Sequence, residues 1–151
     1  MYFIFTLITA LLSPVVFPCS EFLGTVHYNP TERTVLAPIV FQGRVHTTIT
    51  TDDPTGQIFH ACVKIQQVFK SPFEIPQEIC FGSFGIQELC LTYVFEGYDY
   101  VFFMNEDFTA RYDGFPVAAL RVTDELVAAV RRGYCPGQES LWQHCGKIKI
   151  T

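Results

Sequence analysis

Two segments in which apolar and polar residues alternate constrain the fold of this chain more than any other feature. Residues 35–51 and 57–70 each place apolar side chains at every second position. Successive side chains of a strand point to opposite faces of a sheet, so both segments predict half-buried strands. Turn residues at 52–56 lie between them and predict one long hairpin. The apolar face holds Ile39, Phe41, Gly43, Val45, Thr47 and Ile49, then Phe59, Ala61, Val63 and Ile65; the polar face holds Gln42, Arg44, His46 and Thr48, then His60, Cys62, Lys64 and Gln66.

Further short strands are predicted along the rest of the chain. Residues 78–81, 87–91 and 98–104 have strand composition and are separated by glycine-containing turns. A glycine inside the first long strand, Gly43, predicts a bulge or sharp bend of the kind that barrels use. Short strands with a turn signal about every ten residues predict a mainly β fold, either a barrel or a sandwich.

The period changes to that of a helix near the C-terminus. Thr123 or Asp124 can cap its first amides, and Arg131-Arg132 favourably occupy its last turn. Gly133 is expected at the left-handed position that ends many helices. A C-terminal tail comprises residues 136–151. An apolar stripe on the helix consists of Leu126, Val127 and Val130.

The first twenty residues carry no charged side chain. The apolar run 2–12 has the length of a signal-peptide core, and Pro14 and Pro18 interrupt the residues after it, so residues 1–19 are expected to be a cleaved signal peptide. A signal anchor is the competing interpretation, because the uncharged stretch is close to the length that spans a membrane. After cleavage no membrane insertion is expected. Residues 20–34 are expected to form an N-terminal arm with a turn at Asn29-Pro30.

The chain contains six cysteines, and export would place them in an oxidising compartment. Six cysteines allow fifteen pairings, and the sequence does not choose among them. There is no C-x-x-C motif, so neither a redox dithiol nor a zinc knuckle is indicated. Structural disulfides are the expected role of Cys19, Cys62, Cys80, Cys90, Cys135 and Cys145.

Composition excludes several classes of function. The net charge of −5 argues against a nucleic-acid partner, because such binding depends on clustered Lys and Arg. An aromatic strand containing Tyr98, Tyr100, Phe102 and Phe103 resembles a base-stacking surface, but core packing is the preferred interpretation. A chain of 151 residues has room for one ordinary domain.

No constellation of catalytic residues is present. His27, His46, His60 and His144 are scattered, and no pair has metal-ligand spacing. His46 and His60 are expected to face each other across the hairpin as a surface pair. Asp52-Asp53 is interpreted as turn chemistry. The chain has no nucleophile elbow, phosphate loop or zincin motif, so no catalysis, cofactor or metal is expected.

Three segments resemble a known family. They are the strand pair 40–45 and 61–70, Cys90 followed by the strand Tyr100-Val101-Phe102-Phe103-Met104-Asn105, and the last helix running into Cys135. Together they resemble the N-terminal laminin-binding domain of agrin, a relative of the netrin modules and the tissue inhibitors of metalloproteinases. The resemblance spans residues 35–135 and implies an OB-fold-like closed barrel with a C-terminal helix, stapled by disulfides.

The resemblance implies a secreted, non-catalytic module of the extracellular matrix that binds the laminin coiled coil in basement membranes. Carried onto this chain, the apolar stripe Leu126, Val127 and Val130 would contact that partner; alternatively, the stripe packs on the barrel. A fragment of a neuregulin-like growth-factor precursor is a second identity. A metalloproteinase inhibitor is a third, although Cys19-Ser20-Glu21 lacks the Cys-x-Cys that chelates the protease zinc.

Overall fold

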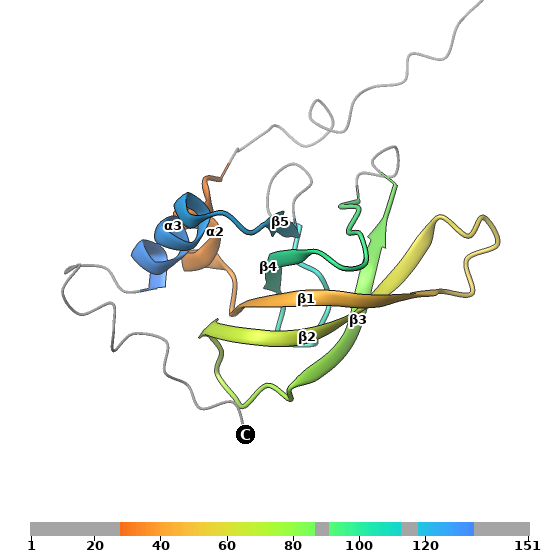
Figure 1. The fold of residues 1–151 in the computed structure, drawn as a ribbon, viewed down its shortest axis with the longest axis horizontal. Helices are drawn as coiled ribbons and strands as arrows, with labels where there is room; N and C mark the ends of the chain where they lie inside the picture. The colour runs from red at the N-terminus through yellow and green to blue at the C-terminus, as the bar shows by residue number, and fades with distance from the viewer. Residues whose placement is uncertain (1–27, 87–90, 113–117, 135–151) are drawn as a thin grey trace, which may run out of the picture.

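The computed structural model describes residues 28–86, 91–112 and 118–134 (Figure 1). A five-stranded antiparallel sheet has the strand order β3-β2-β1-β4-β5, and two helices lie together at one end of its long central hairpin. The elements are α2 (Pro30–Leu36), β1 (Ile39–Thr50), β2 (Ile58–Lys70), β3 (Glu78–Gly85), β4 (Asp99–Met104), β5 (Ala119–Arg121) and α3 (Asp124–Tyr134).

The predicted hairpin is confirmed, and its strands cross the centre of the sheet. β1 and β2 pair along almost their whole lengths, from Val40 opposite Lys70 to Thr50 opposite Phe59. A register shift lies between Gln42 and Gly43, as the mid-strand glycine predicts. A Cβ on Gly43 would collide with the Val63 side chain and lie 2.8 Å from the Lys64 carbonyl oxygen. Glycine is therefore needed here for the close approach of the two strands.

One face of the sheet holds the larger apolar core, in which phenylalanine rings from four strands meet. Phe102 of β4 lies at the centre and contacts Phe41 of β1 and Phe81 of β3, with ring centroids 5.3 Å away in both cases. The predicted alternation on this face is confirmed except at Thr47, which is partly buried, and at Ile49, which is exposed because it lies near the tip of the hairpin. Cys62, predicted on the polar face, is buried. Other members include Ile39, Val45, Phe59, Ala61, Val63, Ile65, Phe84, Tyr100 and Met104.

The opposite face is divided into a covered and an uncovered part. At one end Val40, Val101 and Phe103 pack against the helices in a second core. Leu126 and Val130 of α3 contribute the helical side of this core. Further along the same strands, β1 and β2 carry Gln, Arg and Lys side chains that no described helix covers. This polarity is why an exposed sheet face is tolerated there.

A helix replaces the turn that Asn29-Pro30 predicts. The Asn29 side chain accepts from the Glu32 amide, and the Glu32 carboxylate accepts from the Asn29 amide, which is a complete capping box. Pro30 then occupies the first helical turn, where its missing N–H costs nothing. The Thr31 hydroxyl donates to the Ala129 carbonyl of α3. The fold therefore extends into the segment expected to be an arm, and Val35 lies in this helix rather than in β1.

The C-terminal helix α3 is confirmed, but its glycine has another role. Thr123 caps it, since its hydroxyl accepts from the Leu126 amide at 3.1 Å. Gly133 lies within the helix and is not left-handed. A Cβ at this position would collide with the Thr31 carbonyl oxygen and lie 2.7 Å from the Thr34 Cβ. Gly133 thus permits close contact between α3 and α2.

The sheet is not closed into a barrel by its five strands, so the fold confirms the mainly β class and the helix but only part of the expected architecture. One short segment does connect distant strands. Thr109 forms a bridge with Gly82 of β3, and the adjacent Ala110 forms a bridge with Met104 of β4. This segment brings the edge strand β3 close to the far half of the sheet.

One disulfide is described, between Cys62 of β2 and Cys80 of β3, and it confirms two of the six expected structural cysteines. The other four, Cys19, Cys90, Cys135 and Cys145, lie outside the described residues, as do the predicted signal peptide, the C-terminal tail and most of the strand expected at 87–91. None of the helices that the structure describes is long and apolar enough to cross a membrane.

Candidate interaction surface

The three side chains expected to contact a partner lie against the sheet. Leu126 is 8% exposed and Val130 is fully buried in the second core, while Val127 is partly buried beside them. The stripe therefore packs on the protein itself, which is the alternative raised from the sequence. Burying an apolar helix face against a sheet stabilises the fold.

The two histidines expected to face each other have different neighbours. His46 Nε2 lies 2.9 Å from Glu78 Oε1, so this contact reaches from β1 across β2 to β3. His60 pairs in register with Ile49, and its imidazole occupies the space beside Gly82. No group of three or more His, Cys, Asp or Glu side chains within the described ranges could hold a metal ion.

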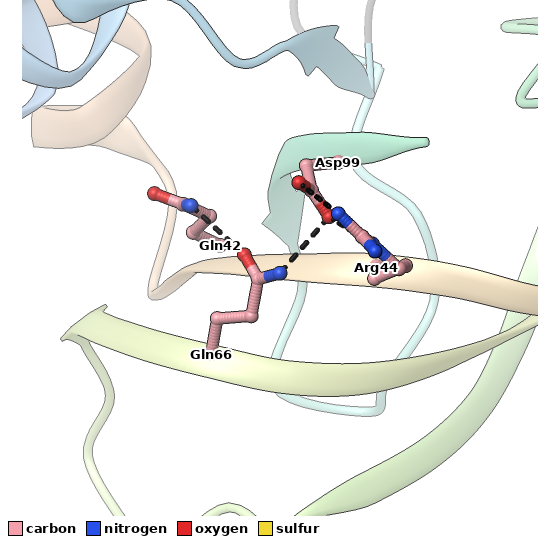
Figure 2. A network of polar contacts seen from close by, with 4 residues as sticks. All are labelled: Gln42, Arg44, Gln66 and Asp99. Atoms are coloured by element: carbon pink, nitrogen blue, oxygen red, sulfur yellow. Dashed lines mark hydrogen bonds and ion pairs between the residues drawn. The ribbon is translucent and has the colours of Figure 1, made fainter. Parts of the chain in front are cut away.

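A hydrogen-bonded network covers the polar part of the sheet (Figure 2). Arg44 donates two hydrogen bonds to Asp99, from Nε at 2.7 Å and from Nη2 at 2.8 Å. Gln66 Nε2 donates to the same carboxylate at 2.9 Å, and Gln42 Nε2 donates to Gln66 Oε1. The hydrogen bond from Arg44 holds the pKa of Asp99 below its usual range. The network links the four side chains to one another on an exposed face of the sheet.

Replacing Asp99 with asparagine tests this network. The folded-state pKa of Asp99 is depressed, so the ionised carboxylate stabilises the protein above its unfolded-state pKa, and this effect is lost as the pH falls through the folded value. We expect a Tm decrease of about 1–3 °C at pH 7, because the ion pair is exposed. The difference between the two proteins in thermal melts should shrink as the pH falls below the ordinary range of an aspartate carboxyl and through the depressed folded-state pKa. A difference that is constant with pH would contradict this role for Asp99.

Three exposed aromatic side chains form a continuous ridge, which we call the aromatic ridge: Tyr93, Phe95 and Tyr98. Their exposed fractions are 48%, 56% and 45%. The ring centroids of Tyr93 and Phe95 are 4.8 Å apart, and those of Phe95 and Tyr98 are 6.3 Å apart. Contiguous exposed aromatic residues of this kind mark interaction surfaces on soluble proteins.

The backbone beneath the aromatic ridge is held firmly against β1. Glu96 Oε1 accepts from both the amide (2.7 Å) and the hydroxyl (3.0 Å) of Thr48. The Gly97 amide donates to the Val45 carbonyl at 2.7 Å, and the Val45 amide donates to the Tyr98 carbonyl at 3.1 Å. Gly97 has φ +83°, a conformation that favours glycine and turns the chain into β4.

Two tyrosine hydroxyls, those of the buried Tyr100 and the partly buried Tyr112, hold the same segment by hydrogen bonds. The Phe95 amide donates to the Tyr100 hydroxyl at 3.1 Å, and the Thr92 amide donates to the Tyr112 hydroxyl at 3.3 Å. Burial raises the pKa of Tyr112, so this phenol stays protonated at neutral pH. The exposed rings are therefore presented by a fixed backbone, and a partner would not have to order this segment on binding.

Arg121 of β5 extends the aromatic ridge toward the helices. Its guanidinium carbon lies 3.9 Å from the centroid of the Tyr98 ring, which is a cation–π contact. Arg121 also borders a shallow hollow of about 350 Å³ between β5 and α3. The hollow is lined by Pro30, Leu120, Arg121, Thr123, Glu125, Leu126 and Ala129.

The orientation of the rings restricts what the aromatic ridge can bind. Neighbouring rings are inclined by 52° (Tyr93 and Phe95) and 80° (Phe95 and Tyr98). Bases stack on exposed aromatic faces, and one face of Tyr98 is covered by Arg121. A corrugated apolar surface beside an arginine instead has the composition of protein–protein hot spots.

Tyr93 and Phe95 were not among the site residues predicted from the sequence. The strand predicted at residues 98–104 was interpreted as core. This is confirmed for Tyr100, Phe102 and Phe103, whereas Tyr98 is exposed. The signal that could have identified the ridge is the alternation of Tyr93, Val94 and Phe95, in which only Val94 is buried. Comparison with protein-family models and with curated proteins gives no match for this chain.

Proposed function

We propose that this chain is a secreted, non-catalytic binding module of the extracellular matrix, and that its partner is the coiled coil of laminin in basement membranes. The observation that carries the binding role is the rigidly held, exposed aromatic ridge, ending at Arg121. The choice of laminin rests on the resemblance to the N-terminal domain of agrin.

We further propose that the β sheet is an open form of an OB-fold-like barrel. Three features support this proposal: the bulge at Gly43, the strand order, and the bridges that Thr109 and Ala110 make to β3 and β4. A bulge increases local twist and bends a strand, which a small barrel requires. In such a barrel the larger core is the interior, and the helices pack outside it.

Binding to a purified laminin coiled-coil fragment tests the proposed function. The full-length gene is expressed in eukaryotic cells, and the protein is recovered from the medium, which tests export in the same experiment. We expect Phe95→Ala and Tyr98→Ala each to weaken binding about tenfold or more, because truncating a hot-spot aromatic residue removes most of its contact area. Both changes are at exposed positions, so thermal melts should stay close to those of the wild type.

Phe73→Ala is the matched control. Phe73 is 40% exposed and packs against Phe108, but it lies in the connection between β2 and β3 and has no ring contact with the aromatic ridge. We expect this variant to bind laminin as the wild type does. Equal losses in all three variants would contradict a role for the aromatic ridge. Failure of the exported wild-type protein to bind would exclude laminin as the partner.

A further inference from the structure

The Cys62–Cys80 disulfide joins one buried cysteine to one exposed cysteine. Cys62 is 2% exposed, whereas Cys80 is exposed on the edge strand β3. The two cysteines lie directly opposite each other in the register of β2 and β3. Cys80 is therefore the cysteine of this pair that solvent, and a thiolate in it, can approach.

Charged and titratable side chains surround this bond on the polar face of the sheet. Residues two positions apart in a strand lie on the same face of the sheet. His60 and Lys64 of β2 therefore flank Cys62, and the Glu78 carboxylate of β3 lies beside Cys80. His46 of β1 contacts the same carboxylate, with Nε2 2.9 Å from Glu78 Oε1. The four residues are His46, His60, Lys64 and Glu78. Lys64 supplies a positive charge on this face, and a cation near a disulfide stabilises a departing thiolate and so favours exchange.

The two halves of β3 are held unequally. The half Gly82–Gly85 has partners on its outer edge: the Ala110 amide donates to the Gly82 carbonyl at 2.7 Å, and the Gly85 amide donates to the Thr92 carbonyl at 3.1 Å. The Tyr112 hydroxyl adds a hydrogen bond to the Ser83 carbonyl. Within the described part of the chain, the half Glu78–Phe81 pairs only with β2. The disulfide is therefore the strongest tie on the less supported half.

We propose that Cys62–Cys80 is a thiol-exchangeable bond that locks the half Glu78–Phe81 of the edge strand. A small thiolate, such as that of glutathione, attacks Cys80 Sγ and forms a mixed disulfide there. The S–S bond breaks, and its electron pair leaves on Cys62 Sγ as a thiolate. A second glutathione thiolate then attacks the glutathione sulfur of the mixed disulfide, releasing the Cys80 thiolate and oxidised glutathione. Two thiols thus supply the two electrons that reduce the protein.

Reduction releases one half of the strand and leaves the other in place. The half Glu78–Phe81 loses its covalent tie and keeps the ladder to β2, the contact between Glu78 and His46, and the packing of Phe81 in the larger core. Its opening therefore begins at the Glu78 end. The half Gly82–Gly85 keeps its bonds to Ala110, Tyr112 and Thr92. The outcome is a local change at one edge of the sheet, distant in the strand order from β4 and β5.

The site of attack is tested on the folded, full-length protein with glutathione at pH 7.5. Free thiols are alkylated at intervals, and adducts are located by mass spectrometry. We expect glutathione on Cys80 to exceed glutathione on Cys62 by at least about tenfold, with alkylated Cys62 in the same molecules. Adducts mainly on Cys62, or no exchange at this bond until circular dichroism shows global unfolding, would overturn the proposal.

Hydrogen exchange tests the local opening. In the variant C62A/C80S we expect amides of residues 78–81 to exchange at least about tenfold faster than in the oxidised wild type, with residues 82–85 changed less than about twofold. Uniform acceleration across β3, or no acceleration, would overturn the locking role.

The contribution of local charge is tested by substitution. We expect Lys64→Gln to slow thiol exchange about two- to fivefold, because the departing thiolate loses a nearby cation. Arg132→Gln, which removes an exposed charge from the far end of α3, should exchange at the wild-type rate. Equal rates for the two variants would overturn the assignment of Lys64.

Discussion

Phe102→Ala lowers the free energy of unfolding by about 3–5 kcal/mol, the range typical of truncating a buried phenylalanine. Phe102 is fully buried and its ring packs against four other rings, those of Phe41, Phe81, Phe84 and Tyr100. These rings come from β1, β3 and β4, so the cavity left by alanine removes contacts between strands that are not neighbours. Denaturant unfolding followed by circular dichroism measures the change.

Phe102→Leu is the control for this prediction. Leucine keeps much of the apolar volume, so it should cost clearly less than alanine. The slope of unfolding free energy against denaturant should stay the same in both variants, since the fold remains the same. A loss below about 1 kcal/mol for Phe102→Ala would contradict the central position of this ring in the core.

Removing the disulfide in the double variant C62A/C80S is expected to cost about 3 kcal/mol. The bond joins cysteines 18 residues apart, and a cross-link of this span restricts the unfolded chain by about that amount. Alanine suits the buried position of Cys62, and serine suits the exposed position of Cys80. The loss is smaller than the stability typical of a domain, so the variant should still fold.

Equilibrium unfolding of the variant and of the oxidised wild type measures this cost. The single variant Cys80→Ser is the comparison, because it breaks the same bond but leaves a buried thiol at Cys62. Both variants should lose similar stability if the cross-link is the source of the effect. A much smaller loss in the double variant would instead assign the effect to the free thiol.

Local regularities made much of the fold predictable. The alternation in β1 and β2 depends only on strand geometry, and it identified the hairpin and the buried positions Phe41, Val45, Phe59, Ala61, Val63 and Ile65 correctly, but not the exposure of Ile49 or the burial of Cys62. Thr123 was identifiable as a cap because capping involves residues three positions apart. Gly43 was recognisable as the position of a bulge because glycine weakens a strand interior and often marks a bulge or a close approach of two backbones.

Features that depend on distant segments were not predictable. Gly133 had the expected position for a helix end, but the approach of α2, about a hundred residues earlier in the chain, determines its role. Asn29-Pro30 suits both a turn and a helix start, and contact with α3 favours the helix. The stripe Leu126, Val127 and Val130 is equally suited to a partner or to the sheet, because amphipathicity shows that a face is covered but not what covers it.

By itself, the sequence determined the mainly β class, the central hairpin, the terminal helix and the core character of the aromatic strand, because each follows from side-chain periodicity within one segment. Only the tertiary structure decided which apolar residues stay uncovered. Tyr93, Phe95 and Tyr98 are as apolar as their buried neighbours, yet Glu96 and Gly97 tie their segment to the edge of β1 with these rings facing solvent. Exposure depends on how the segments pack together, and no periodicity within a single segment contains that information.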